Sequence, residues 1–195
     1  EFVEAEDHFE AQAAKDAVVE VSGQIKTIAI GLMKIASDIR LMGSGPRCSI
    51  AEIRLPETQP GSSIMPGKVN PVMCEMLIQV CCQAIGADTA ITHAARESFF
   101  ELNVGMPVMA HNLLEAIRIL STATRVFTDR CVAGIEADEK RCAELIESSL
   151  AMCTSLAPKL GYDKAAAIAK EAYKTGKPVR QVAAEQKVLS PSELD

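Results

Sequence analysis

The sequence predicts an all-α fold in which long helices of a bundle are followed by a small helical domain. Apolar residues recur every three or four positions early in the chain, which is the spacing of a helix packed along its length. Sustained apolar–polar alternation is lacking and aromatic residues make up only 4% of the chain, so strands are not favoured. We expect part of a bundle at residues 1–134 and the small, truncated domain at residues 135–195.

The first predicted helix has an apolar seam whose spacings alternate between three and four without a break. The seam consists of Val18, Val21, Ile25, Ile28, Leu32, Ile35, Ile39 and Met42. Its other faces are also partly apolar, at Ile30, Met33 and Leu41. Because charges do not fill the remaining faces, we expect this helix to be surrounded by neighbours or buried between subunits.

Later helices are predicted from their boundary residues. A second helix begins at Pro71 and runs to about Ile91, with Asn70 placed to cap it. A third helix follows Pro107, and after Gly134 the pattern changes to shorter helices separated by glycines. The shorter helices are expected at about 138–154, 162–174 and 178–186.

Bulk properties exclude several classes of partner. The net charge is −6 over 195 residues, with both signs interspersed, so neither nucleic acid nor an anionic membrane surface is favoured. No apolar run approaches the roughly 20 residues of a membrane span. The seven cysteines lack C-x-x-C spacing, so we expect reduced core thiols in a reducing compartment and no metal site.

Both ends of the chain look cut. It begins at Glu1 without methionine, while Ser190, Pro191 and Glu193 have the pattern of a helix N-cap, a first-turn proline and a capping-box glutamate. We therefore interpret the chain as a fragment of a longer enzyme.

The segment 43–71 is the exception to the helical pattern. It shows no periodicity and is rich in proline and glycine, and structureless loops of this length inside a domain are usually functional or disordered. Ile50, Ile53 and Leu55 are suitable anchors for its first half, so we interpret it as a functional loop.

Two kinds of site are conceivable at residues 61–71, GSSIMPGKVNP. A phosphate loop is excluded, because five residues separate Gly61 from Gly67 and Val69 replaces the metal-binding hydroxyl. A carboxylate site fits better: Lys68 supplies a cation, Asn70 a donor, and the N-terminus of the following helix supplies free N–H groups.

This stretch resembles the signature of the aspartase/fumarase superfamily. Four other segments occur in the order that class II fumarases show them: FEAQA at 9–13, GSGPR at 43–47, FELN at 100–103 and GYD at 161–163. The resemblance covers essentially the whole chain and implies the C-terminal half of such an enzyme.

The resemblance implies a role for each residue of the signature. Ser62 is expected to be the base that removes a proton from the carbon beside a carboxylate. Glu75 is expected to partner a catalytic histidine that lies upstream of this chain in the family. The expected substrate-binding residues are Ser63, Lys68, Val69 and Asn70.

Fumarate hydratase, which converts fumarate to (S)-malate, is the activity that the resemblance implies. Gly67 and residues 100–103 favour fumarase, whereas Val72 and residues 177–195 lean toward aspartate ammonia-lyase. A noncatalytic helical assembly module is a third interpretation. The resemblance also implies a homotetramer with shared active sites, no cofactor, and a location in the cytoplasm or, in a eukaryote, the mitochondrion.

Overall fold

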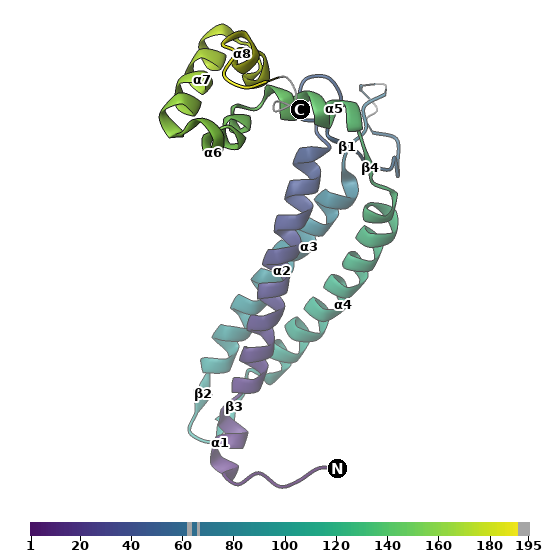
Figure 1. Ribbon diagram of the computed structural model, residues 1–195. Helices are drawn as coiled ribbons and strands as arrows, with labels where there is room; N and C mark the ends of the chain where they lie inside the picture. The colour runs from purple at the N-terminus through teal and green to yellow at the C-terminus, as the bar shows by residue number, and fades with distance from the viewer. Residues whose placement is uncertain (62–63, 66, 191–195) are drawn as a thin grey trace. The chain divides into compact units, whose positions relative to one another are not determined.

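The computed structural model describes residues 1–61, 64–65 and 67–190, and helices dominate it (Figure 1). The predicted all-α fold class is confirmed. The chain divides into two compact units, unit 1 at Glu1–Glu136 and unit 2 at Ala137–Asp195. The sequence did not predict the short helix α1, the single turn α6 or four strands of two residues each. These elements are α1 (His8–Ala13), α6 (Ala157–Leu160), β1 (Ile53–Arg54), β2 (Ser98–Phe99), β3 (Leu102–Asn103) and β4 (Glu136–Ala137).

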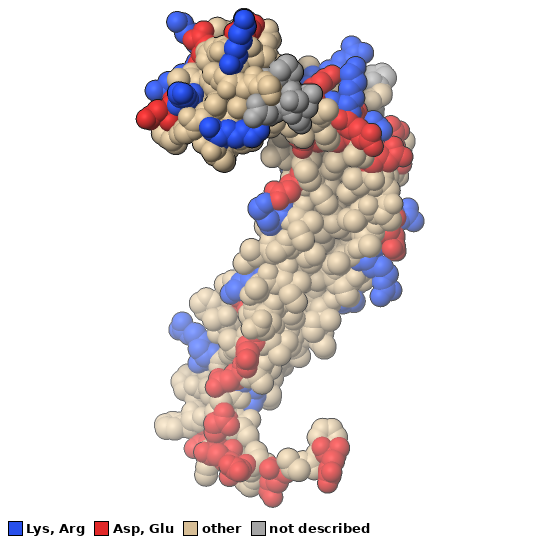
Figure 2. All heavy atoms as spheres, in the orientation of Figure 1, with Lys and Arg blue, Asp and Glu red and all other residues tan. Residues whose placement is uncertain are grey.

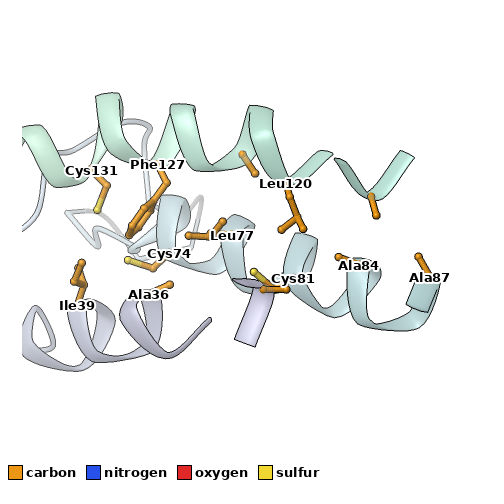
Figure 3. Close-up of a cluster of buried hydrophobic side chains, with 13 residues drawn as sticks. Ala36, Ile39, Cys74, Leu77, Cys81, Ala84, Ala87, Leu120, Phe127 and Cys131 are labelled. Carbon is orange, nitrogen blue, oxygen red and sulfur yellow. The ribbon is translucent and has the colours of Figure 1, made fainter. Parts of the chain in front are cut away.

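Unit 1 is built on three long helices that lie side by side, α2 (Asp16–Met42), α3 (Val72–Arg96) and α4 (Met106–Arg130). Helix α3 packs against both of the others. Its inward face repeats every three or four residues and is made of small or medium side chains (Figure 3): Cys74, Leu77, Cys81, Ala84 and Ala87. Small residues let helix axes approach closely, so the predicted bundle packing is present in α3.

Helix α2 packs along a line next to the predicted seam. Its buried positions include Ser22, Ala29 and Ala36, seven residues apart. The preceding residues Val21, Ile28 and Ile35 are 46%, 59% and 50% exposed. Other members of the predicted seam do contact the core: Ile25, Leu32, Ile39 and Met42. The chain's own helices therefore cover one face of α2, and a second apolar face stays open. Figure 2 shows few charged side chains over the middle of unit 1.

A buried polar cluster joins α2 to α3. Ser22 Oγ donates to Asp88 Oδ1 at 2.7 Å and Lys26 Nζ to Asp88 Oδ2 at 2.6 Å. Burial acts to raise the pKa of Asp88, but the hydrogen bonds and the charge of Lys26 outweigh it, so the pKa is lowered. A carboxylate held this way fixes the pairing of the two helices, because any shift along the axis would leave it buried without partners.

The connection from α3 to α4 is a short antiparallel hairpin, in which Ser98 pairs with Asn103. Asn103 is fully buried. Its Nδ2 donates to the carbonyl of Ala95 at 2.9 Å, and its Oδ1 accepts from the N–H of Gly105 at 2.7 Å. A Cβ at Gly105 would lie 2.5 Å from the carbonyl oxygen of Ala94. Asn103 therefore holds this turn.

Unit 2 has its own core. Its elements are α5 (Glu139–Ser148), a 3₁₀ segment (Leu150–Ser155), α6, α7 (Tyr162–Thr175) and α8 (Val179–Glu185). Asp138 caps α5 by accepting from the N–H of Arg141. The first predicted helix of this region, at 138–154, was too long, because α5 ends at Ser148 and a 3₁₀ segment follows. The buried side chains are Leu156, Ala165, Ile168, Ala172, Val179, Val182 and Ala183.

The cysteines differ from the sequence expectation. Cys74, Cys81 and Cys131 are buried and Cys142 and Cys153 are partly exposed, while Cys48 and Cys82 are exposed. The prediction of core thiols is therefore wrong for the last two. Among the described residues, no group of His, Cys, Asp and Glu side chains is arranged to hold a metal ion. None of the described helices combines the length and apolar character needed to cross a membrane. The helix predicted to start near Pro191 lies outside the described residues.

Candidate active site

The loop between α2 and α3 is anchored in its first half. The N–H of Ala51 donates to the carbonyl of Ser44 at 2.7 Å, and that of Glu52 to the carbonyl of Met42 at 3.0 Å. Ile53 and Leu55 pack against the core of unit 1. These hydrogen bonds and contacts close residues 44–52 into a compact turn, and they agree with the anchoring expected from the apolar residues.

The second half of the loop is closed on itself at Gly61. Asn70 Nδ2 donates to the carbonyl of Gly61 at 3.0 Å. A Cβ on Gly61 would lie 1.3 Å from the carbonyl oxygen of Lys68, a distance that no side chain tolerates. Only glycine at this position lets the two ends of the segment 61–70 meet.

Asn70 therefore has a different local role from the one predicted. Helix α3 begins with Pro71 in the capping position and has no side-chain capping bond. The prediction that Asn70 caps this helix is wrong, because its amide group reaches back nine residues to Gly61 instead. The N–H of Val72 donates to the carbonyl of Asn70 at 2.8 Å. The positive end of the α3 dipole still favours an anion near the end of the loop.

Lys68 and Val69 lie on the same segment and are both exposed. The backbone N–H of Lys68 donates to the carbonyl of Met65 at 3.2 Å. Within the part of the chain that the structure describes, no carboxylate pairs with the Lys68 ammonium group. Ser62 and Ser63 lie outside the described residues. An exposed ammonium group four residues ahead of Val72, where α3 begins, provides a positive local environment.

Glu75 lies in the first turn of α3, and a partner that the sequence analysis missed reaches it from α2. Arg40 Nη2 lies 3.4 Å from Glu75 Oε1. The carboxylate is thus explained by an ion pair as well as by the expected catalytic role. The only sign of this ion pair in the sequence is that Arg40 lies in the last turn of a long helix. A cation at that position is also explained by its favourable interaction with the helix dipole.

Comparisons with known proteins identify the family. A family model described as Lyase matches residues 1–86, and one described as Fumarase C C-terminus matches residues 152–195. The class II fumarate hydratase 2 of Bradyrhizobium diazoefficiens is 52% identical over 100% of this chain and 41% of its own length. Fumarate hydratase 2 of Arabidopsis thaliana is 53% identical, over 100% and 39% respectively.

Solved structures give the same result. The class II fumarase of Schistosoma mansoni superposes with a TM-score of 0.93 at 40% identity, over 100% of this chain and 40% of that one. A fumarate lyase:delta crystallin of Brucella melitensis gives 0.90 at 45% identity, over 100% and 44%. The chain spans well under half the length of these relatives. Its sequence and fold place it in the lyase family and, within that family, among the class II fumarases.

Proposed function

We propose that the protein containing this chain is a fumarate hydratase, which interconverts fumarate and (S)-malate. The observation that carries the proposal is the grouping of Lys68, Asn70, the N-terminus of α3 and Glu75 on one segment of a chain about half identical to fumarate hydratases. A dicarboxylate suits this site because the ammonium group and the helix N–H groups both favour negative charge.

The chemistry follows from the charge that develops on the substrate. In the dehydration direction, Ser62 removes the proton from the carbon beside a carboxylate, and the electron pair is delocalised into that carboxylate. The hydroxyl group on the neighbouring carbon then leaves as water after accepting a proton. Ser63, Lys68, Val69 and Asn70 hold the substrate, and Lys68 offsets the charge that builds up in the transition state.

Glu75 acts on the second proton transfer. We propose that it accepts a hydrogen bond from a histidine contributed by another segment of the full-length protein and raises the basicity of that histidine. The reaction requires only side chains, so no cofactor is needed. Exclusion of water around the bound substrate would strengthen the attraction of the Lys68 ammonium group for a serine alkoxide.

The assembly is proposed to be a homotetramer whose active sites are shared between subunits. Val21, Ile28 and Ile35 support it, because they form an exposed apolar stripe with the seven-residue spacing of helix–helix seams. Helix α4 adds exposed Leu114 and Ile117. The isolated chain is expected to be inactive. The cytoplasm, or the mitochondrion in a eukaryote, is the expected location.

The deciding experiment follows the ultraviolet absorbance of fumarate with the full-length protein, with and without ammonium. Loss of absorbance without ammonium establishes a hydratase. Loss that requires ammonium identifies an aspartate ammonia-lyase and overturns the proposal. No loss in either buffer points to another substrate within the superfamily or to the noncatalytic assembly module.

Ser62→Ala tests the assignment of the base. We expect kcat to fall by about 1,000-fold or more, within the range seen when a nucleophile or base is removed, while KM changes little. Ser121→Ala is the matched control, because Ser121 lies on α4 and donates only to the backbone carbonyl of Arg118. Full activity of Ser62→Ala would remove Ser62 from the mechanism.

A further inference from the structure

Glu75 and Arg40 come from different helices and from positions 35 residues apart in the chain. Arg40 lies in the last turn of α2 and Glu75 in the first turn of α3. The contact joins Arg40 Nη2 to Glu75 Oε1 at 3.4 Å, with side chains 53% and 36% exposed. Arg40 is the side chain that pairs with Glu75 in the part of the chain that the structure describes.

The ion pair between Arg40 and Glu75 contributes little to the stability of the fold. Partly exposed ion pairs contribute little to stability, because solvent screens them and both side chains lose freedom. The ends of α2 and α3 are already joined by buried apolar side chains, among them Ala36, Ile39 and Cys74 (Figure 3). The pair is therefore not needed to hold the helices together, and its effect falls on the carboxylate.

The two thiols next to the start of α3 are neutral. Cys74 precedes Glu75 on α3, and Cys131 at the end of α4 lies against Cys74. Burial raises the pKa of Cys74 to about 12 and also raises that of Cys131. Both thiols are protonated at neutral pH and add no charge. Among the described residues, the cation paired with Glu75 is Arg40.

We propose that Arg40 is a positioning residue for Glu75. The guanidinium group of Arg40 holds the carboxylate of Glu75 in the orientation in which that carboxylate accepts a hydrogen bond from the histidine. The guanidinium group also offsets part of the negative charge of Glu75. This inference rests on the role given to Glu75 under the proposed function. Arg40 would set both the geometry of the Glu75–histidine pair and the pH at which the histidine loses its proton.

The test uses the full-length enzyme with the variants Arg40→Gln and Arg40→Lys. We expect Arg40→Gln to lower kcat by about 10- to 100-fold with a much smaller change in KM, because misplacement of a catalytic group by about 1 Å costs up to about 100-fold. Arg40→Lys keeps the charge and should recover part of the loss. The control is Arg118→Gln, which removes an exposed ion pair with Glu115 within α4, and its kcat should stay unchanged.

The pH profile separates positioning from mere stabilisation. Without Arg40 the charge of Glu75 is no longer offset, so the pKa of the histidine rises. For hydration of fumarate, in which the histidine accepts a proton from water, the acid limb of the profile therefore moves to higher pH. A structural role alone would lower the melting temperature and leave that limb in place. Size-exclusion chromatography with light scattering checks that every variant assembles as the parent does.

A double-mutant cycle shows whether Arg40 acts through Glu75. Once Glu75→Gln has removed the carboxylate, Arg40→Gln should cost no more than about twofold in kcat, since residues that act together are not additive. Wild-type kcat and pH profile in Arg40→Gln, or full additivity in the double variant, would overturn the inference while leaving the proposed function intact. Wild-type activity of Glu75→Gln would instead refute the role of Glu75, and the inference with it.

Discussion

The two units of the chain differ in how completely they bury the large apolar side chains of their helices. In unit 2, Ile168, Val179 and Val182 are almost fully buried within the unit itself. In unit 1, Ile28 and Ile35 on α2 are half exposed or more, beside a line of small buried residues. A surface helix normally buries its apolar stripe and exposes charge. Helices α7 and α8 of unit 2 follow this pattern, whereas α2 of unit 1 has more apolar surface than the helices of its own unit cover.

This difference is what the proposed tetramer requires of unit 1. In that proposal, the apolar surface of α2 packs against other subunits, and residues from several chains meet on these helices. Substitutions in the exposed stripe of α2 and in the core of unit 2 test this contrast directly, and substitutions at one polar link in each unit extend it.

The largest effect is expected from placing charges on the exposed stripe of α2. In the full-length protein, Ile28→Glu combined with Ile35→Glu should dissociate the assembly and lower activity by about 100-fold or more, because an unpaired buried carboxylate costs several kcal/mol. Light scattering coupled to chromatography measures the mass. Tyr173→Glu, at an exposed position of α7 in unit 2, is the control. A tetramer in the double variant would show that this stripe is not an interface.

A cavity in the core of unit 2 should have a large but local effect. Ile168 is 1% exposed, and Ile168→Ala should lower the free energy of unfolding of this unit by about 3 kcal/mol, from lost burial and the cavity left behind. Hydrogen exchange of peptides from α7 measures it, with α3 peptides as the internal control. Equal loss of protection in both would mean that the units unfold together.

These predictions rest on features that differ in how visible they are in the sequence. The three long helices were predictable because their apolar spacing extends over 25 or more residues and prolines mark two of the starts. Helix α1 has a local signal in Asp7, which accepts from the N–H groups of Phe9 and Glu10, but its six residues are too few to show a period. The hairpin at 98–103 was missed for the same reason.

The apolar seam of α2 was identified in the sequence. The sequence did not show which apolar residues of α2 pack against helices of the same chain and which stay exposed. Periodicity shows that a face is apolar, and it does not say which neighbour covers it. The small residues Ala29 and Ala36 contact α3, while Ile28, one position earlier, faces outward. Both sets share the same repeat, so only the packing separates them.

The segment that carries the candidate site was predictable from the sequence, but the contacts made by its residues were not. Lys68 and Glu75 were found from the motif and its resemblance. The partners of Asn70 and Glu75, which are Gly61 and Arg40, lie nine and 35 residues away. One amide group suits a helix cap and a loop closure equally well, and only the backbone path from Gly61 decides between them.

The buried cluster of unit 1 gives a smaller, pH-dependent effect. Lys26→Met leaves the Asp88 carboxylate with only Ser22, which should cost about 2 kcal/mol at neutral pH. In the parent the pKa of Asp88 is lowered on folding, so its contribution is present above the unfolded pKa of about 3.9 and is lost as the pH falls through the folded value. Chemical denaturation at pH 7 and at pH 3 measures this. A difference that persists unchanged at the lower pH would contradict the role of the charge.

The smallest effect is expected at the corresponding polar link of unit 2. Arg180 Nε and Nη2 donate to the two oxygens of Glu147 at 3.2 and 3.0 Å, joining α8 to α5. Both side chains are about two-fifths exposed, at 38% and 41%, so solvent screens the pair. Arg180→Met should therefore cost only about 0.5 kcal/mol, and added salt should reduce that cost further. Hydrogen exchange of α8 peptides at low and high salt measures it. The result would contradict this prediction if Arg180→Met lowered the free energy of unfolding as much as Lys26→Met does and salt had no effect. The Arg180–Glu147 pair would then act as a buried ion pair, as the Lys26–Asp88 pair does, and the two units would not differ in this respect.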